Sequence, residues 1–189
     1  MADSPRPAVF LDRDGVLNQV FVRAGVTHPP AHVGEFEFLP GVPQAVRRLH
    51  AAGFALVVVT NQPDVARGLQ TREGVEAIHQ RLRDELPMLE VLACYHDNGD
   101  DCACRKPRPG MLLEAARRWQ IDLRRSFLVG DRWSDVIAGQ AAGCRTVLVE
   151  TPYSGRERCA PEHCAGDLAG AVEWILTVTR GRKEHEAVC

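Results

Sequence analysis

Two carboxylates follow directly behind a short apolar segment near the start of the chain. Residues 8–11 read Ala-Val-Phe-Leu, and Asp12, Arg13, Asp14 and Gly15 come next. An unbroken apolar run bounded by turn residues is typical of a buried strand in a parallel sheet, where ligands bind beyond the carboxyl ends of the strands. Carboxylates two residues apart on extended backbone point the same way, so Asp12 and Asp14 can share a hard cation. The alternative is a plain surface turn, which Asp and Gly also favour.

Three later segments bring polar residues to comparable positions. They are Thr60-Asn61-Gln62 behind the apolar run 54–59, Lys106 within 105–111, and Gly130-Asp131 behind the run 126–129. A hydroxyl and backbone N–H groups at a strand end can hold phosphate oxygens, although a threonine there is more commonly only a cap. Asp135 opens the next predicted helix, where a carboxylate suits the helix dipole as well as it suits catalysis.

Four potential ligands for a soft metal ion lie close together in the middle of the chain. They are Cys94, His96, Cys102 and Cys104. Three thiolates and one imidazole within eleven residues match a closed tetrahedral Zn²⁺ site of the Cys₃His type. The polar turn 97–101 between them cannot form a core, which favours a zinc staple over free thiols. Cys159 and Cys164 have only His163 beside them and lack a fourth ligand, so we expect free thiols there.

Strands and helices are predicted to alternate along the chain. The strands are expected at 8–11, 54–59, 89–93, 126–129 and 145–149, and the helices begin near residues 40, 71, 110, 135 and 168. This alternation predicts a three-layer α/β sandwich with a Rossmann-like parallel sheet, in one domain spanning 1–189 with its core at about 8–178. The segment 19–39 lacks periodicity and is expected to loop over the mouth of the site, whereas the charged tail 181–189 is expected to be disordered.

The composition argues against several classes of partner. The formal net charge is −2 and only 6% of residues are aromatic, so we expect neither a nucleic-acid surface nor a membrane patch, but a small soluble substrate and a monomer. The first residues lack an apolar signal core, which favours a cytoplasmic protein. Seven cysteines, an odd number, disfavour a disulfide framework.

The four motifs, in this order, resemble those of the haloacid dehalogenase-like phosphatases. The resemblance covers roughly residues 8–176 and is greatest to the capless branch that holds the D-glycero-D-manno-heptose 1,7-bisphosphate 7-phosphatases and the histidinol-phosphatases. The first of these groups carries the same Cys-x-His and Cys-x-Cys pairs immediately before an Arg-Lys pair, here Arg105 and Lys106. The resemblance implies a Mg²⁺-dependent phosphomonoesterase without a large cap, acting on a small sugar bisphosphate, with D-glycero-D-manno-heptose 1,7-bisphosphate as the expected substrate. A histidinol-phosphate phosphatase, a polynucleotide 3′-phosphatase and a non-catalytic zinc module are the alternatives.

The resemblance also implies a role for each motif residue. Asp12 is the nucleophile that forms an aspartyl-phosphate, and Asp14 is the general acid and base. Mg²⁺ is held by Asp12, by the backbone carbonyl of Asp14 and by Asp131, while Lys106 and Thr60 stabilise the transferring phosphoryl group.

Substrate recognition is expected from further residues of the same loops. They are Asn61, Gln62, Arg67, Arg105 and Arg132. Guanidinium groups fit phosphate by bidentate hydrogen bonds, and the resemblance implies that Arg105 recognises substrate. The alternative is a basic rim that attracts any anion.

Overall fold

A single parallel sheet organises the part of the chain that the structure describes. This computed structural model describes residues 5–23 and 26–186. The sheet has six strands in the order β5-β4-β1-β6-β7-β8, and all neighbouring pairs are parallel. The strands are β1 Ala8–Leu11, β4 Ala55–Asn61, β5 Glu90–Cys94, β6 Phe127–Gly130, β7 Arg145–Val149 and β8 His163–Ala165. Because the chain builds outward from β1 in both directions, the carboxyl end of β1 lies at a topological switch point, where ligands bind in such sheets.

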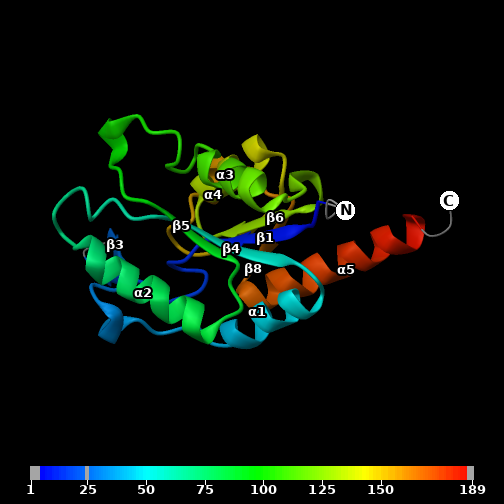
Figure 1. The fold of residues 1–189 in the computed structure, drawn as a ribbon, viewed down its shortest axis with the longest axis horizontal. Helices are drawn as coiled ribbons and strands as arrows, with labels where there is room; N and C mark the ends of the chain where they lie inside the picture. Colours follow the sequence, from blue (N-terminus) through cyan, green and yellow to red (C-terminus); the bar gives the residue numbers. More distant parts are fainter. Residues whose placement is uncertain (1–4, 24–25, 187–189) are drawn as a thin grey trace.

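Helices cover both faces of the sheet. They are α1 Val42–Ala51, α2 Arg72–Glu85, α3 Gly110–Trp119, α4 Trp133–Ala142 and α5 Leu168–Glu186. Alternate residues of β1 enter different cores, since Val9 and Leu11 pack with α1, α2 and α5, whereas Ala8 and Phe10 pack with α3 and α4. Figure 1 shows these two layers on either side of the sheet. The predicted three-layer α/β fold is therefore confirmed.

Three details differ from the expectations drawn from the sequence. The segment 19–39 is not all loop, because β2 Phe21–Arg23 pairs antiparallel with β3 Val26–His28. A sixth strand, β8, was missed because it has only three residues and lies at the sheet edge. The tail expected to be disordered from residue 181 is instead helical as far as Glu186, since α5 continues through it, and residues 187–189 lie outside the described part.

Among the described residues, no helix combines the length and the apolar character needed to cross a bilayer.

The two adjacent leucines of α3 test the packing directly. Leu112 is fully buried against the sheet, whereas Leu113 is 45% exposed. Leu112→Ala is expected to lower the free energy of unfolding by ~2–5 kcal/mol, because it leaves a cavity in the core. The matched Leu113→Ala is expected to change it by less than ~0.5 kcal/mol. Urea denaturation of both variants is the measurement, and equal losses would contradict the packing described here.

Candidate active site

The carboxyl ends of the central strands open into one cleft. Its volume is about 480 Å³. The sheet side is lined by Asp12 and Asp14 behind β1, and by Thr60, Asn61 and Gln62 at the end of β4. The β2–β3 segment contributes its rim through residues 26–29, so part of the segment 19–39 does border the site mouth. The sequence motifs therefore converge at the switch point of the sheet.

A buried lysine lies among carboxylates at the centre of this cleft. The Lys106 Nζ lies 2.9 Å from Asp12 Oδ1 and 2.5 Å from Asp135 Oδ1, and it donates to the Val59 carbonyl at 2.8 Å. All three charged side chains are almost completely buried. Burial raises the pKa of Asp12 to about 6 despite the nearby Lys106. Burial also disfavours the charged form of Lys106, but Asp12 and Asp135 outweigh it and hold the lysine pKa above its ordinary value.

Asp131 adds a third carboxylate to the group without a balancing cation. Oxygens of Asp12, Asp131 and Asp135 all lie within 4.8 Å of one another. Neither carboxylate oxygen of the buried Asp131 has a hydrogen-bond partner among the described residues. Its pKa is raised well above the ordinary value by burial and then by the charges of Asp12 and Asp135. Three carboxylates facing one ammonium leave excess negative charge, and this donor set fits a hard divalent cation such as Mg²⁺.

Gly15 allows Asp131 to approach the first motif. Its φ is +89°, and a Cβ at this position would overlap the carboxylate of Asp131. Any other residue would be strained here and would push Asp131 away. Asp135, in turn, serves two purposes, because it caps α4 by accepting the Arg132 backbone N–H at 3.0 Å and also pairs with Lys106.

The Asp14 side chain is held apart from this group by other partners. Arg13 donates to both of its oxygens at 3.0 and 2.9 Å, Asn18 donates at 2.9 Å and Gln62 at 2.7 Å. Burial alone would raise the pKa of Asp14, but Arg13 and the hydrogen bonds from Asn18 and Gln62 lower it overall. These hydrogen bonds hold the Asp14 carboxyl group in a fixed orientation at the edge of the cleft.

The side chains of the three residues at the end of β4 form different contacts. Thr60 accepts a hydrogen bond from the Gln62 amide at 2.9 Å and belongs to the lining of the cleft. Asn61 exchanges two hydrogen bonds with the Lys106 backbone, at 3.0 and 3.1 Å. Asn61 thus fixes the position of the lysine as well as lining the cleft.

Three arginines line the outer part of the same cleft. Arg67 forms two hydrogen bonds with Asp97, at 2.9 and 2.6 Å. Arg105 donates to the Asn98 side chain at 2.9 Å and to the His96 carbonyl at 3.2 Å. Arg132 donates to Thr27 of β3. Two of the three are therefore held by the loop that contains the cysteine cluster.

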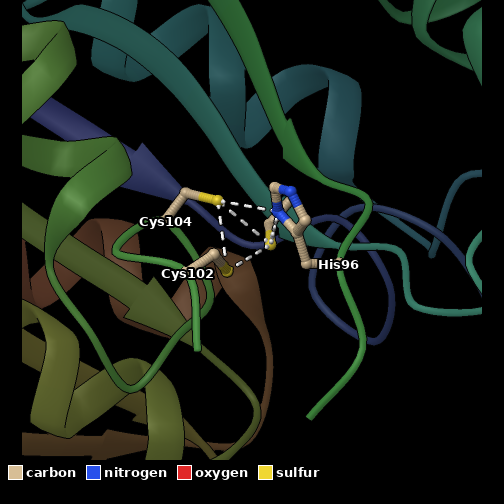
Figure 2. A group of neighbouring side chains, drawn as sticks. His96, Cys102 and Cys104 are labelled. Carbon is tan, nitrogen blue, oxygen red and sulfur yellow. Dashed lines mark hydrogen bonds between the residues drawn. The ribbon is translucent and has the colours of Figure 1, made fainter. Parts of the chain in front are cut away.

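The predicted metal ligands Cys94, His96, Cys102 and Cys104 lie together beside this cleft. The sulfur–sulfur distances are 3.2 to 3.6 Å, and His96 Nδ1 lies 3.4 Å from the Cys104 sulfur. A tetrahedron with Zn–S bonds of about 2.3 Å has edges of roughly 3.7 Å, so the spacing is compatible with Zn²⁺. Figure 2 shows His96, Cys102 and Cys104 directed toward one common point. Cys159 and Cys164 are unbridged and belong to no such group among the described residues.

Two residues near the site were not anticipated. His79 of α2 is completely buried, and its Nε2 lies 3.1 Å from Arg13 Nη1. Its spacing, four residues after Val75 and three before Leu82, places it on the apolar face of the helix, and this spacing is the signal that could have shown its burial. The guanidinium carbon of Arg132 lies over the ring of Tyr153, 5.4 Å from the ring centroid. Burial and the charge of Asp131 raise the pKa of Tyr153 to about 12. Nothing in its sequence surroundings pointed to the site.

Comparison with known proteins agrees with this arrangement. The family model described as HAD-hyrolase-like matches residues 103–171. The D-glycero-D-manno-heptose-1,7-bisphosphate 7-phosphatase of Thermosynechococcus vestitus is 38% identical, over 92% of this chain and 97% of its own. The D-glycero-beta-D-manno-heptose-1,7-bisphosphate 7-phosphatase of Escherichia coli K12 is 42% identical, over 90% of this chain and 88% of its own.

A solved structure shows the same likeness in three dimensions. It is the D,D-heptose 1,7-bisphosphate phosphatase of Bordetella bronchiseptica, complexed with magnesium and phosphate. It superposes with a TM-score of 0.78 at 36% identity, over 90% of this chain and 98% of its own. Both the sequence and the fold of the relatives are thus matched over nearly their full length. The chain belongs to the D-glycero-D-manno-heptose-1,7-bisphosphate 7-phosphatase family of haloacid dehalogenase-like hydrolases.

Proposed function

We propose that this protein is a Mg²⁺-dependent phosphatase that removes the 7-phosphate of D-glycero-D-manno-heptose 1,7-bisphosphate. The observation that carries the proposal is the buried group of Asp12, Asp131, Asp135 and Lys106 at the carboxyl end of β1, open to a cleft lined by arginines. The substrates named for the relatives supply the choice of sugar. We further propose that the enzyme acts as a cytoplasmic monomer in the synthesis of nucleotide-heptose precursors of lipopolysaccharide.

The metal proposal depends on the unsatisfied carboxylate of Asp131. Because its oxygens have no hydrogen-bond partner among the described residues, a cation is the group that would offset their burial. Asp12, Asp131 and the backbone carbonyl of Asp14 would hold the ion. When bound, Mg²⁺ neutralises this cluster and polarises a phosphoryl oxygen of the substrate.

The protein residues carry out two displacements at phosphorus. The Asp12 carboxylate attacks and forms an aspartyl-phosphate, and the oxygen of the sugar leaves as an alcohol with the proton that the protonated form of Asp14 gives it. Asp14 then takes a proton from a water molecule, which attacks the same phosphorus and releases inorganic phosphate and free Asp12. Lys106 and the Thr60 hydroxyl hold the phosphoryl oxygens during both steps.

The second phosphate of the substrate is assigned to the arginine-rich part of the cleft. Lys106 already serves the reacting phosphoryl group, so Arg67, Arg105 and Arg132 are available for another anion. Their present partners, Asp97, Asn98 and Thr27, lie at the surface and can be exchanged for phosphate oxygens. Asn61 and Gln62 complete the contacts that we expect with the sugar.

The nucleophile is tested by Asp12→Asn. An amide cannot attack phosphorus, so turnover is expected to fall below a few per cent of that of the wild type. Circular dichroism and the melting temperature should show a folded protein. Asp84→Asn, which alters an exposed carboxylate of α2, is the matched control and should retain full activity. A folded, uncontaminated Asp12→Asn enzyme with substantial turnover would refute the assignment.

The cysteine cluster is tested by elemental analysis. We expect one Zn²⁺ per chain in protein purified without chelators, and loss of Zn²⁺ in Cys102→Ser but not in Cys159→Ser, which lies outside the cluster. Chelation should release the loop 94–104 and reduce activity, because Arg105 and Lys106 lose their position, and Mg²⁺ alone should not restore it. Zinc-free wild-type protein with normal activity would count against this role.

The bisphosphate preference is tested by Arg105→Ala. If Arg105 holds the phosphate that is not cleaved, kcat/KM for the heptose bisphosphate should fall, and the corresponding loss of transition-state stabilisation should be ~1.5–3 kcal/mol, as for a lost charged hydrogen bond. The kcat/KM for a monophosphate such as histidinol phosphate should change little. Arg117→Ala, an exposed arginine on α3, should change neither. Unchanged zinc content must accompany the result, because Arg105 also contacts His96. Equal losses on both substrates would contradict the bisphosphate assignment, and a wild-type preference for histidinol phosphate would favour that alternative.

A further inference from the structure

A buried polar chain leads from Asp14 into the interior, and the reaction described above makes no use of it. Arg13 is fully buried, and its guanidinium links Asp14 on one side to His79 of α2 on the other. The Nδ1 of His79 lies 3.5 Å from Glu76 Oε1, and Glu76 accepts a hydrogen bond from the Tyr95 hydroxyl. The chain thus connects the proposed general acid and base to a helix that contributes no residue to the cleft.

The donors and acceptors of this chain define the protonation of His79. A guanidinium has only N–H donors, so His79 Nε2 must accept at the 3.1 Å contact with Arg13 Nη1. The remaining ring proton is then on Nδ1, which faces the Glu76 carboxylate. The imidazole is consequently neutral, in the Nδ1–H tautomer. Burial and then Arg13 lower its pKa to about 4, with Arg83 adding to this effect and Glu76 opposing it.

The same contacts leave Arg13 little freedom. Nε and Nη2 donate to Asp14, and Nη1 is directed at His79, so the plane of the guanidinium is fixed from both ends. The paired hydrogen bonds of an Arg–carboxylate fork impose an orientation on the carboxylate as well. Without an acceptor at His79, the Nη1 group would be buried with no partner there, and the fork could rotate to find one. The orientation of Asp14 therefore depends on a residue that cannot touch the substrate.

We propose that His79 is a positioning residue for catalysis, which accepts from Arg13 and so holds Asp14 in the orientation that serves the leaving alcohol and the attacking water. The assignment rests on the proposed function, because it takes Asp14 as the general acid and base. Glu76 has a weaker, electrostatic role, since its carboxylate lies 3.5 Å from His79 Nδ1, which forms no hydrogen bond among the described residues; the contact with Arg13 is what fixes the tautomer.

Leaving-group dependence distinguishes positioning from a general structural role. p-Nitrophenolate is a stable anion that needs no proton to leave, whereas a sugar alkoxide does. In single-turnover experiments, His79→Ala is expected to slow release of the sugar alcohol from the heptose bisphosphate by ~10- to 100-fold, as for a displaced catalytic group. Release of p-nitrophenolate from p-nitrophenyl phosphate should change by less than about threefold, because it does not require the acid. In separate steady-state measurements, the KM values of His79→Ala for both compounds should stay close to those of the wild type.

Conservative and distant substitutions complete the design. His79→Gln presents an amide oxygen to Arg13 and an amide N–H to Glu76, so it should restore most of the sugar-release rate. His50→Ala, an exposed histidine of α1, should be indistinguishable from the wild type. Equal slowing of both leaving groups by His79→Ala in a folded protein, or no slowing of either, would overturn the positioning role. A wild-type enzyme that hydrolyses neither compound would instead overturn the proposed function, and the role of His79 with it.

A measurement on the wild type avoids any failure of a variant to fold. ¹⁵N chemical shifts of the imidazole report the tautomer directly. We expect His79 to be neutral, with its proton on Nδ1, throughout pH 5 to 8, in agreement with a pKa of about 4. A proton on Nε2, or a charged imidazole at pH 7, would place N–H against N–H at the Arg13 contact and would overturn the proposal.

Discussion

The close approach of three buried carboxylates at the carboxyl end of the sheet is the constraint on which the rest of this structure depends. Carboxylate oxygens of Asp12, Asp131 and Asp135 lie within 4.8 Å of one another and are almost completely buried, and Lys106 supplies one balancing charge. Desolvated like charges at such distances repel by several kcal/mol, even at an effective dielectric constant of about 20. The fold must therefore hold them together rigidly and leave room for a divalent cation, and this combination suits the transfer of a phosphoryl group.

Several otherwise unrelated features serve that constraint. Gly15 makes space for Asp131, and Asp135 is fixed by capping α4 while it pairs with the lysine. Lys106 follows the last cysteine of the cluster by two residues, and Asn61 of β4 clamps its backbone from the other side. The cluster that fits Zn²⁺ and the end of a central strand thus position the same cation, while Arg13 keeps the second carboxylate of the first motif apart from the repelling group.

The sequence predicted the parts of the site that local patterns encode. Apolar runs followed by Asp12, Thr60 or Asp131 show where strands end, and because parallel strands end at one edge, their convergence could be inferred without a structure. The spacing of the cysteines identified their cluster in the same way. Contacts between distant segments could not be predicted, since no local pattern links His79 to Arg13, or Tyr153 to Arg132. Short elements, such as the edge strand β8 and the separate β2–β3 pair, depend on tertiary packing more than on periodicity, and they were missed for that reason.

Titration of the metal-free protein with Mg²⁺ in a calorimeter tests the central claim most directly. If the carboxylate group is the metal site, one Mg²⁺ should bind per chain, and binding near pH 6, about the pKa of Asp12, should release protons that are not released at pH 8. The comparison of two buffers with different ionisation enthalpies gives the number of protons. Asp131→Asn should weaken binding strongly. Mg²⁺ binding that is unaffected by this substitution, or that releases no proton near pH 6, would contradict the account.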